Sequence, residues 1–98
     1  MEYLTKSLKR GTQIAYVPDH VKNAWKETGY HPAVEFGFVN TICSDNKAAF
    51  CRYWVQGNPG VLRTIANSER TDLNDIFLHD SVSQEVVDET IAKIDEIY

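Results

Sequence analysis

Four β-patterned runs follow one another between Gly11 and Ala66, with apolar residues that alternate with polar ones or continue over short stretches. Each run is rich in β-branched or aromatic residues and is bounded by Gly, Pro, Asn or Asp, as is typical of strands. The runs cover residues 12–17, 34–43, 48–55 and 61–66. They predict a β-rich α+β fold in one domain over residues 1–98: a small, strongly bent antiparallel β-barrel at 11–79 and a C-terminal amphipathic helix at 81–98.

The two middle runs form a hairpin whose register follows from its turn. A two-residue turn at residues 45–46 places Cys43 beside Ala48 and Cys51 opposite Asn40. The two cysteines then lie on opposite faces of the ribbon, because side chains alternate along a strand. This arrangement predicts free thiols rather than a disulfide, whereas a loop of odd length would reverse the geometry and leave the disulfide open.

Period-two alternation divides the side chains of this hairpin between two faces. The more apolar face is expected to form the core and carries Phe36, Phe38, Ile42, Ala49, Cys51, Tyr53 and Val55. The other face is amphipathic and carries Val39, Thr41, Cys43, Phe50, Arg52 and Trp54. Gly37 inside the strand predicts a bend or a close approach of another backbone segment.

A long polar connection at residues 19–33 separates the first two strands. Pro18 ends the first strand, since proline fixes its own backbone and has no N–H to donate. The connection is too polar for a strand, and residues 21–25 are expected to form a single helical turn within it. A connection of this length in a small domain is often functional.

The pattern changes to helical spacing after Asp80. Ser81 and Gln84 fit a capping box, and an apolar stripe follows at Val87, Ile91, Ile94 and Tyr98. Either the open end of the barrel or a second subunit must cover this stripe, which leaves a homo-oligomer through the helix open. Just before the helix, residues 75–79 predict a closing strand or a helical turn.

Composition places the chain among globular proteins. The hydrophobic fraction of 43% and the charged fraction of 24% are ordinary, so disorder of the whole chain is a poor interpretation. No apolar run approaches the roughly 20 residues that cross a bilayer, and the basic N-terminus is not followed by an apolar signal core. We expect a cytoplasmic protein with no membrane partner.

The net charge of −4 is unevenly distributed, because residues 1–66 carry +3 and residues 67–98 carry −7. The acidic part is either a solvated helix face, or a surface that meets a basic protein or competes with nucleic acid for the basic part.

No motif for catalysis, metal binding or phosphate binding stands out. The candidate metal ligands lack the tight local spacing of zinc sites; they are Asp19, His20 and His31, with Cys43 or Glu35. His31 is better explained by a structural role, with its ring hydrogen-bonded to a loop carbonyl so that it holds the return of the chain into the strand. The sequence therefore predicts a protein that is not an enzyme and needs no metal or cofactor.

Three stretches share a pattern with a known family. Residues 10–18 read Arg-Gly-Thr-Gln-Ile-Ala-Tyr-Val-Pro, residues 31–39 run from His-Pro to Glu-Phe-Gly-Phe-Val, and residues 49–53 read Ala-Phe-Cys-Arg-Tyr. This pattern resembles small, mostly uncharacterised phage and prophage proteins with a β-barrel of the Src-homology-3 type. The resemblance covers roughly residues 10–66 and implies that barrel, a mobile-element origin, and a binding or accessory role. The C-terminal helix has no counterpart in the pattern.

The candidate binding residues come from the amphipathic hairpin face and the long loop. They are Trp25, Tyr30, His31, Phe50, Arg52 and Trp54. Exposed rings flanked by bases can grip an extended peptide or stack single-stranded bases. The alternative is that Phe50 and Trp54 lie beneath the C-terminal helix or the long loop.

The sequence favours a non-enzymatic binding protein, encoded by a phage or similar element, that engages a protein partner through the 19–33 loop and the aromatic hairpin face. Inhibition of a host defence or regulatory complex is one concrete form of this role. One alternative is a nucleic-acid-binding accessory protein, although its few bases are unlike the markedly basic domains that bind nucleic acid. Another is a self-associating structural or assembly component.

Overall fold

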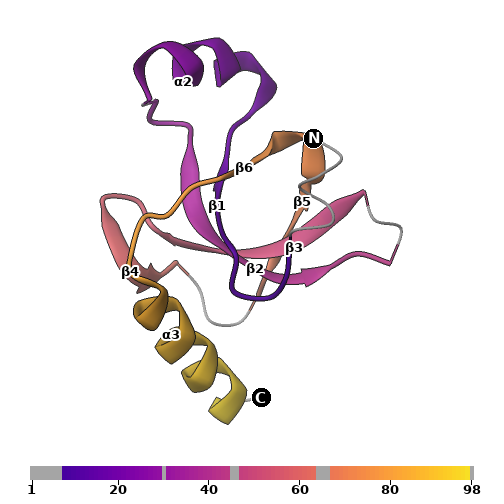
Figure 1. The fold of residues 1–98 in the computed structure, drawn as a ribbon, viewed down its shortest axis with the longest axis vertical. Helices are drawn as coiled ribbons and strands as arrows, with labels where there is room; N and C mark the ends of the chain where they lie inside the picture. The colour runs from indigo at the N-terminus through magenta and orange to yellow at the C-terminus, as the bar shows by residue number, and fades with distance from the viewer. Residues whose placement is uncertain (1–7, 30, 45–46, 64–66, 98) are drawn as a thin grey trace.

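The computed structural model describes residues 8–29, 31–44, 47–63 and 67–97, which form an antiparallel sheet and short helices (Figure 1). The strands are β1 Gln13–Tyr16, β2 Glu35–Ile42, β3 Ala48–Val55, β4 Asn58–Leu62, β5 Glu69–Asp72 and β6 Ile76–Leu78. The helices are α2 Lys22–Thr28 and α3 Gln84–Ile97, with 3-10 turns η1 Asp19–Val21 and η2 Leu73–Asp75. None of these described helices has the length and apolar content needed to cross a membrane.

The strands form one strongly curved sheet in the order β4-β3-β2-β1-β6, and β5 also pairs with β3 (Figure 1). The outer edge of β3 is shared, because β5 pairs with residues 48–51 and β4 pairs with Trp54 and Val55. The η2 turn connects β5 to β6, and β6 returns to pair with β1. No ladder joins β5 to β6 in the described strands, so the sheet is curved but not closed. The prediction of an antiparallel β-rich fold with a C-terminal helix is confirmed at this level.

Several element boundaries differ from those expected. β4 begins at Asn58, three residues before the predicted run at 61–66, because the turn consists only of Gln56 and Gly57, the latter with φ +77°. The predicted end of that strand at 64–66 lies outside the described residues, as does the predicted turn at 45–46. The single helical turn expected at 21–25 is instead η1 followed by the longer helix α2. Gly29, with φ +70°, caps the C-terminal end of α2. β5 was not expected, because its sequence shows no apolar pattern. In the structure only Thr71 of its residues is buried.

A β-bulge in β2 changes which side chains share a face. On the turn side the pairs Ile42 with Ala49 and Thr41 with Phe50 have the predicted register. The register shifts between Val39 and Thr41, so that Cys51 lies opposite Val39 rather than Asn40. An extra residue in one strand moves every later side chain to the other face.

The assignment of Phe36 and Phe38 to the same core face as Cys51 is therefore wrong. Phe38 is fully buried with Trp54 beneath α3, whereas Val39 is fully buried with Cys51. Val55 was also assigned to the core and instead lies on the surface.

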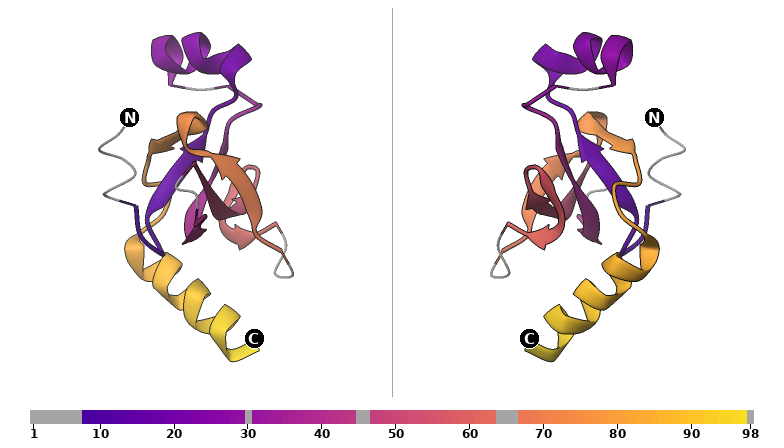
Figure 2. Two further views of the ribbon diagram at one scale, coloured as in Figure 1. Left: turned by 90° about the vertical axis from the view of Figure 1, so that its right-hand side faces the viewer. Right: turned by 90° about the vertical axis from the view of Figure 1, so that its left-hand side faces the viewer.

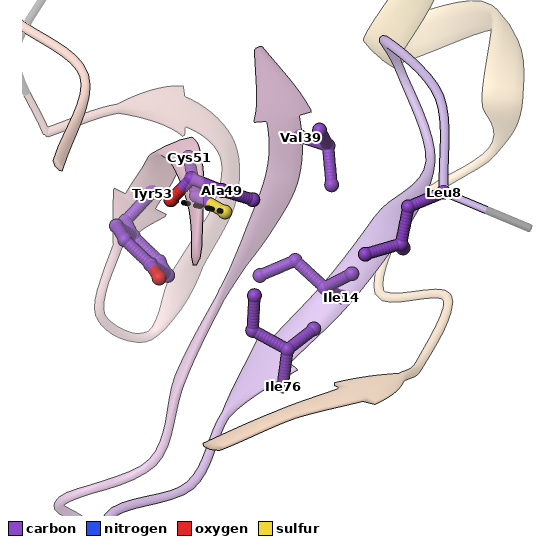
Figure 3. Packing of buried hydrophobic residues seen from close by; sticks show 7 residues of the cluster. All are labelled: Leu8, Ile14, Val39, Ala49, Cys51, Tyr53 and Ile76. Atoms are coloured by element: carbon purple, nitrogen blue, oxygen red, sulfur yellow. Dashed lines mark hydrogen bonds between the residues drawn. The ribbon is translucent and has the colours of Figure 1, made fainter. Parts of the chain in front are cut away.

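Both faces of the sheet carry a core. The inner cluster is drawn in Figure 3, where Ile14 lies next to Ile76; its members are Leu8, Ile14, Val39, Ala49, Cys51, Tyr53 and Ile76. A second cluster joins β1 and the start of β2 to the α2 segment and includes Ala15, Val17, Val21 and Val34. The third holds α3 on the outer face through Phe38, Trp54, Val87 and Ile94.

Gly37 marks a close approach of two strands, as its position in the sequence predicts. A Cβ atom added there would lie 2.0 Å from the carbonyl oxygen of Arg52 and 2.9 Å from the Cα of Tyr53. Only glycine allows the backbones of β2 and β3 to approach this closely.

Helix α3 packs on the outer face of its own sheet through Val87 and Ile94 of its apolar stripe. The helix begins at Gln84 rather than Ser81, so the predicted capping box is wrong. The backbone N–H groups of Ser81 and Val82 instead donate to the side-chain oxygen of buried Gln13, at 3.0 and 3.1 Å. The Gln84 side-chain amide donates to the Gly11 carbonyl at 3.1 Å. These bonds fix the chain before α3 to the start of β1.

Candidate functional site

The predicted row Phe50, Arg52 and Trp54 does not form an exposed face. Arg52 and Trp54 are 7% and 4% exposed, and Phe50 is half-buried. Trp54 lies beneath α3 against Phe38, with ring centroids 5.3 Å apart. The alternative interpretation, that the C-terminal helix covers this ring, is the one observed. Its indole N–H has no hydrogen-bond acceptor in the described part of the chain, so apolar packing holds the ring.

The long-loop residues have different environments. Trp25 is half-buried on α2, and its ring centroid lies 6.0 Å from that of Phe36 and 5.5 Å from that of His79. Tyr30 lies outside the described residues. The Nδ1 atom of His31 accepts a hydrogen bond from the Ala33 N–H at 3.0 Å, which stabilises the return of the chain into β2. His31 thus has the local structural role expected of it, with a different backbone group as partner.

An ion-pair network fixes α2 to the body of the domain. The Lys22 ammonium contacts the carboxylates of Asp19 and Asp75, the latter at 2.7 Å. The hydrogen bond to Asp19, followed by the one to Asp75, raises the pKa of Lys22, and the same Lys22 contact lowers the pKa of Asp19. Asp19 is therefore engaged by a cation rather than free to bind a metal. Within the described residues, no cluster of His, Cys, Asp and Glu side chains forms a metal site.

A pocket of about 120 Å³ forms where the start of β2 meets the β3–β4 turn. Its apolar lining comes from Val34, Phe36, Trp54, Val55 and Pro59, and Glu35, Gln56, Gly57 and Arg63 complete it. We call it the Trp54 pocket. Its volume is several times the roughly 30 Å³ that a water molecule occupies in the liquid. It can therefore accept an aliphatic side chain of a partner molecule.

Polar contacts hold the rim of the Trp54 pocket in place. The guanidinium of Arg63 forms ion pairs with Glu35 and Glu69 and lies over the Tyr53 ring, 5.6 Å from its centroid. The hydrogen bond to Glu69 is the main reason that the pKa of Arg63 is raised, so the guanidinium stays charged. On the opposite side, the Gln56 amide donates to the Pro32 carbonyl at 2.6 Å and joins the β3–β4 turn to the end of the long connection. The rim is fixed by its own chain before any partner arrives.

A more polar cleft of about 360 Å³ adjoins this rim through the shared Glu35. Tyr16 and Tyr53 line it with ring centroids 6.4 Å apart, and the Tyr53 hydroxyl bonds to the Thr71 hydroxyl at 2.6 Å. Burial raises the pKa of Tyr53, which keeps the phenol neutral.

The two cysteines are free thiols. Burial raises the pKa of the Cys51 thiol to about 11, so it is protonated at neutral pH. Cys43 is half-buried near the end of the β2–β3 hairpin, and its N–H donates to the Ala48 carbonyl at 3.0 Å, as the predicted register requires.

No protein-family model, curated protein or solved structure matches the chain. The candidate site therefore depends on the geometry of its own residues. Sequence reasoning singles out Trp54, which lines the pocket, and the 19–33 connection, which contacts the rim through the Pro32 carbonyl. It misses Phe36, Glu35 and Arg63 as lining residues. Only the tertiary pairing of β2, β3 and β4 brings these three together.

Proposed function

We propose that this protein is a non-enzymatic binding protein whose partner is another protein, engaged through α2 and the Trp54 pocket. The observation that carries the proposal is the pocket itself, in which the start of β2 and the hairpin tryptophan form one apolar lining inside a charged rim. Protein interfaces share this anatomy, with an apolar centre, a polar rim and energetic anchors rich in Trp, Tyr and Arg. A rim already held by ion pairs also loses little side-chain entropy on binding.

Helix α2 extends this surface. It projects from one end of the sheet, on the opposite side of the molecule from α3 (Figures 1 and 2). Its Trp25 packs on Phe36, which also lines the pocket, so the helix and the pocket are mechanically connected. Asn23, Lys26 and Glu27 are exposed on the helix and are available for polar contacts with the same partner.

The proposal also includes the type of barrel that the sheet forms and the genetic origin of the protein. A Src-homology-3-type barrel is supported by the return of β6 to β1 and by the η2 turn that joins β5 to β6. The resemblance of residues 10–66 to phage and prophage proteins supports a mobile-element origin. In this view the protein acts in the cytoplasm of a host cell, where inhibition of a defence or regulatory complex is the concrete role.

Nucleic-acid binding is the less favoured alternative, because three of the bases it would need are buried or already engaged. Arg52 is buried, and Lys22 and Arg63 each contact two carboxylates. The net charge of −4 would also repel a phosphate backbone.

The test compares two surface variants in affinity purification from a host lysate. Val55→Asp places a charge at the mouth of the pocket on a side chain that is already 37% exposed, so the fold is retained. Thr41→Asp introduces the same charge at an exposed position of β2 outside the pocket lining and serves as the matched control. We expect a partner that wild type and Thr41→Asp retain and that Val55→Asp loses, with little sensitivity to salt. Equal retention by all three proteins would refute the proposal, and steep loss of binding with rising salt would favour nucleic acid.

A further inference from the structure

A second surface lies where β4 meets α3, in a groove of about 280 Å³. Val61 and Leu62 form the strand side, and Thr90, Ile94 and Ile97 form the helix side. Val61 is 47% exposed and Ile97 is 59% exposed, so two large apolar side chains face solvent across this groove. β4 and α3 lie in the lower part of the molecule in Figure 1, at the end away from α2.

Strand addition is a poor way to fill this groove, although β4 is an edge strand. In the described part of the sheet β4 pairs only with β3, which leaves its other edge open. Pro59 has no N–H to donate, and Gly60 has φ +98°, which departs from extended geometry. Both features prevent a regular backbone ladder along this edge. An occupant must therefore be recognised by its side chains, as when an amphipathic helix lies in an apolar groove.

The charges on α3 define the chemistry of that occupant. Glu85, Glu89 and Glu96 recur at spacings of four and seven, so they share one exposed side of the helix next to the groove. Within the described residues these three carboxylates form no ion pair. Lys93 lies among them and neutralises part of their charge, but the side as a whole stays acidic.

The same charges argue against a second copy of this chain as the occupant. Helix α3 carries five acids and one base, and a symmetric pair would bring two such helices together. Like charges placed opposite each other weaken association, whereas opposite charges steer it and fix its orientation.

We propose that the β4–α3 groove binds a basic amphipathic helix of a partner protein. Its apolar side chains fill the space between Val61 and Ile97, and its lysines or arginines face Glu89 and Glu96. This site goes beyond the proposed function, because it requires neither α2 nor the Trp54 pocket.

The probe is a fluorescein-labelled synthetic peptide of Leu and Lys in a helical repeat, titrated with the full chain and followed by fluorescence anisotropy. One control peptide has Glu in place of every Lys, and a second has the Leu and Lys residues in scrambled order. We expect wild type to bind the first peptide, with affinity that falls as salt rises, and to bind neither control comparably. Binding of the scrambled peptide with equal affinity would reduce the interaction to bulk charge attraction and would overturn the proposal.

Matched variants localise the binding. The double variant Glu89→Lys, Glu96→Lys is expected to weaken binding about tenfold, because exposed ion pairs are worth up to about 1 kcal/mol each. Ile97→Ser is expected to weaken it about fivefold through loss of apolar burial. Glu27→Lys on α2 makes the same type of charge change far from the groove, and we expect affinity within about twofold of wild type. Circular dichroism confirms that each variant is folded.

Two results would overturn the proposal. One is equal peptide affinity for wild type, Ile97→Ser and the double variant. The other is a concentration-dependent dimer of the wild type in light scattering that Ile97→Ser abolishes, which would assign the groove to a second copy. Loss of binding in Val55→Asp alone would place the peptide in the Trp54 pocket instead, so failure of this inference is distinguishable from failure of the proposed function.

Discussion

Truncation of Phe38 tests the bulge in β2, because the bulge decides which core this ring belongs to. Phe38 is fully buried against Trp54, Val87 and Ile94 on the α3 side of the sheet. Removal of a fully buried phenylalanine ring costs about 3–5 kcal/mol, from lost burial and from the cavity left behind. We expect Phe38→Ala to lower the free energy of unfolding by that amount in urea titrations followed by circular dichroism.

A double-mutant cycle tests in which cluster the Phe38 ring lies. The cycle uses the milder change Phe38→Leu, since two large truncations would exceed the roughly 5–15 kcal/mol that stabilises a small domain. Combined with Val87→Ala, a partner in the same cluster, it should show a coupling energy of about 0.5–3 kcal/mol. Combined with Ile76→Val, from the inner cluster, the two effects should add within about 0.5 kcal/mol.

Two outcomes would refute this reasoning. A cost below about 1 kcal/mol for Phe38→Ala would show that the ring is not buried. Strong coupling of Phe38 to Ile76, without coupling to Val87, would show that the register continues without a bulge and that the predicted face was right.

Three further predictions concern the sheet, the thiols and one ion pair. Gly37→Ala should destabilise the domain by about 1–3 kcal/mol or more in urea unfolding, because its Cβ would overlap the backbone of β3; an unchanged midpoint would contradict the close approach. At neutral pH Cys43 should react with a thiol reagent, whereas Cys51, with its pKa raised to about 11, should react only after unfolding; equal native-state rates would exclude this burial. The Arg10 guanidinium lowers the pKa of Asp95 below its ordinary 3.8, so this ion pair stabilises the fold above that pH and its contribution is lost as the pH falls further. Asp95→Asn should reduce the acid-induced drop in melting temperature, and an identical drop would show that the pair contributes nothing.

The local hydrophobic pattern was sufficient to locate a strand where the residues of that strand determine its structure. The hydrophobic runs located β1, β2 and β3 to within a residue or two, and the hairpin turn gave the register of Ile42 with Ala49. The bulge escaped prediction because Asn40, which lies between the paired residues Val39 and Thr41, carries no glycine or proline signal. β5 escaped for a related reason, since its polar residues become a strand only through pairing with β3, which is distant in the sequence.

The candidate site was predictable only in part. The pattern identified Trp54 and the 19–33 connection as notable; Trp54 lines the pocket, and the connection contacts its rim through Pro32. It could not show that α3 covers the outer face of Trp54 and leaves only one side of that residue beside a pocket. It also could not show that Arg63 would be held by Glu35 and Glu69, because these three residues belong to different segments of the chain.

We propose that a protein partner engages the Trp54 pocket. Hydrogen–deuterium exchange on the purified complex measures directly whether the segments around this pocket become protected. Gln56 and Gly57 form the exposed turn at the mouth of the pocket, and residues 31–34 approach it from the long connection. We expect amide exchange to slow in these two segments when the partner is bound. Unchanged exchange in both, with protection confined to other segments, would contradict it.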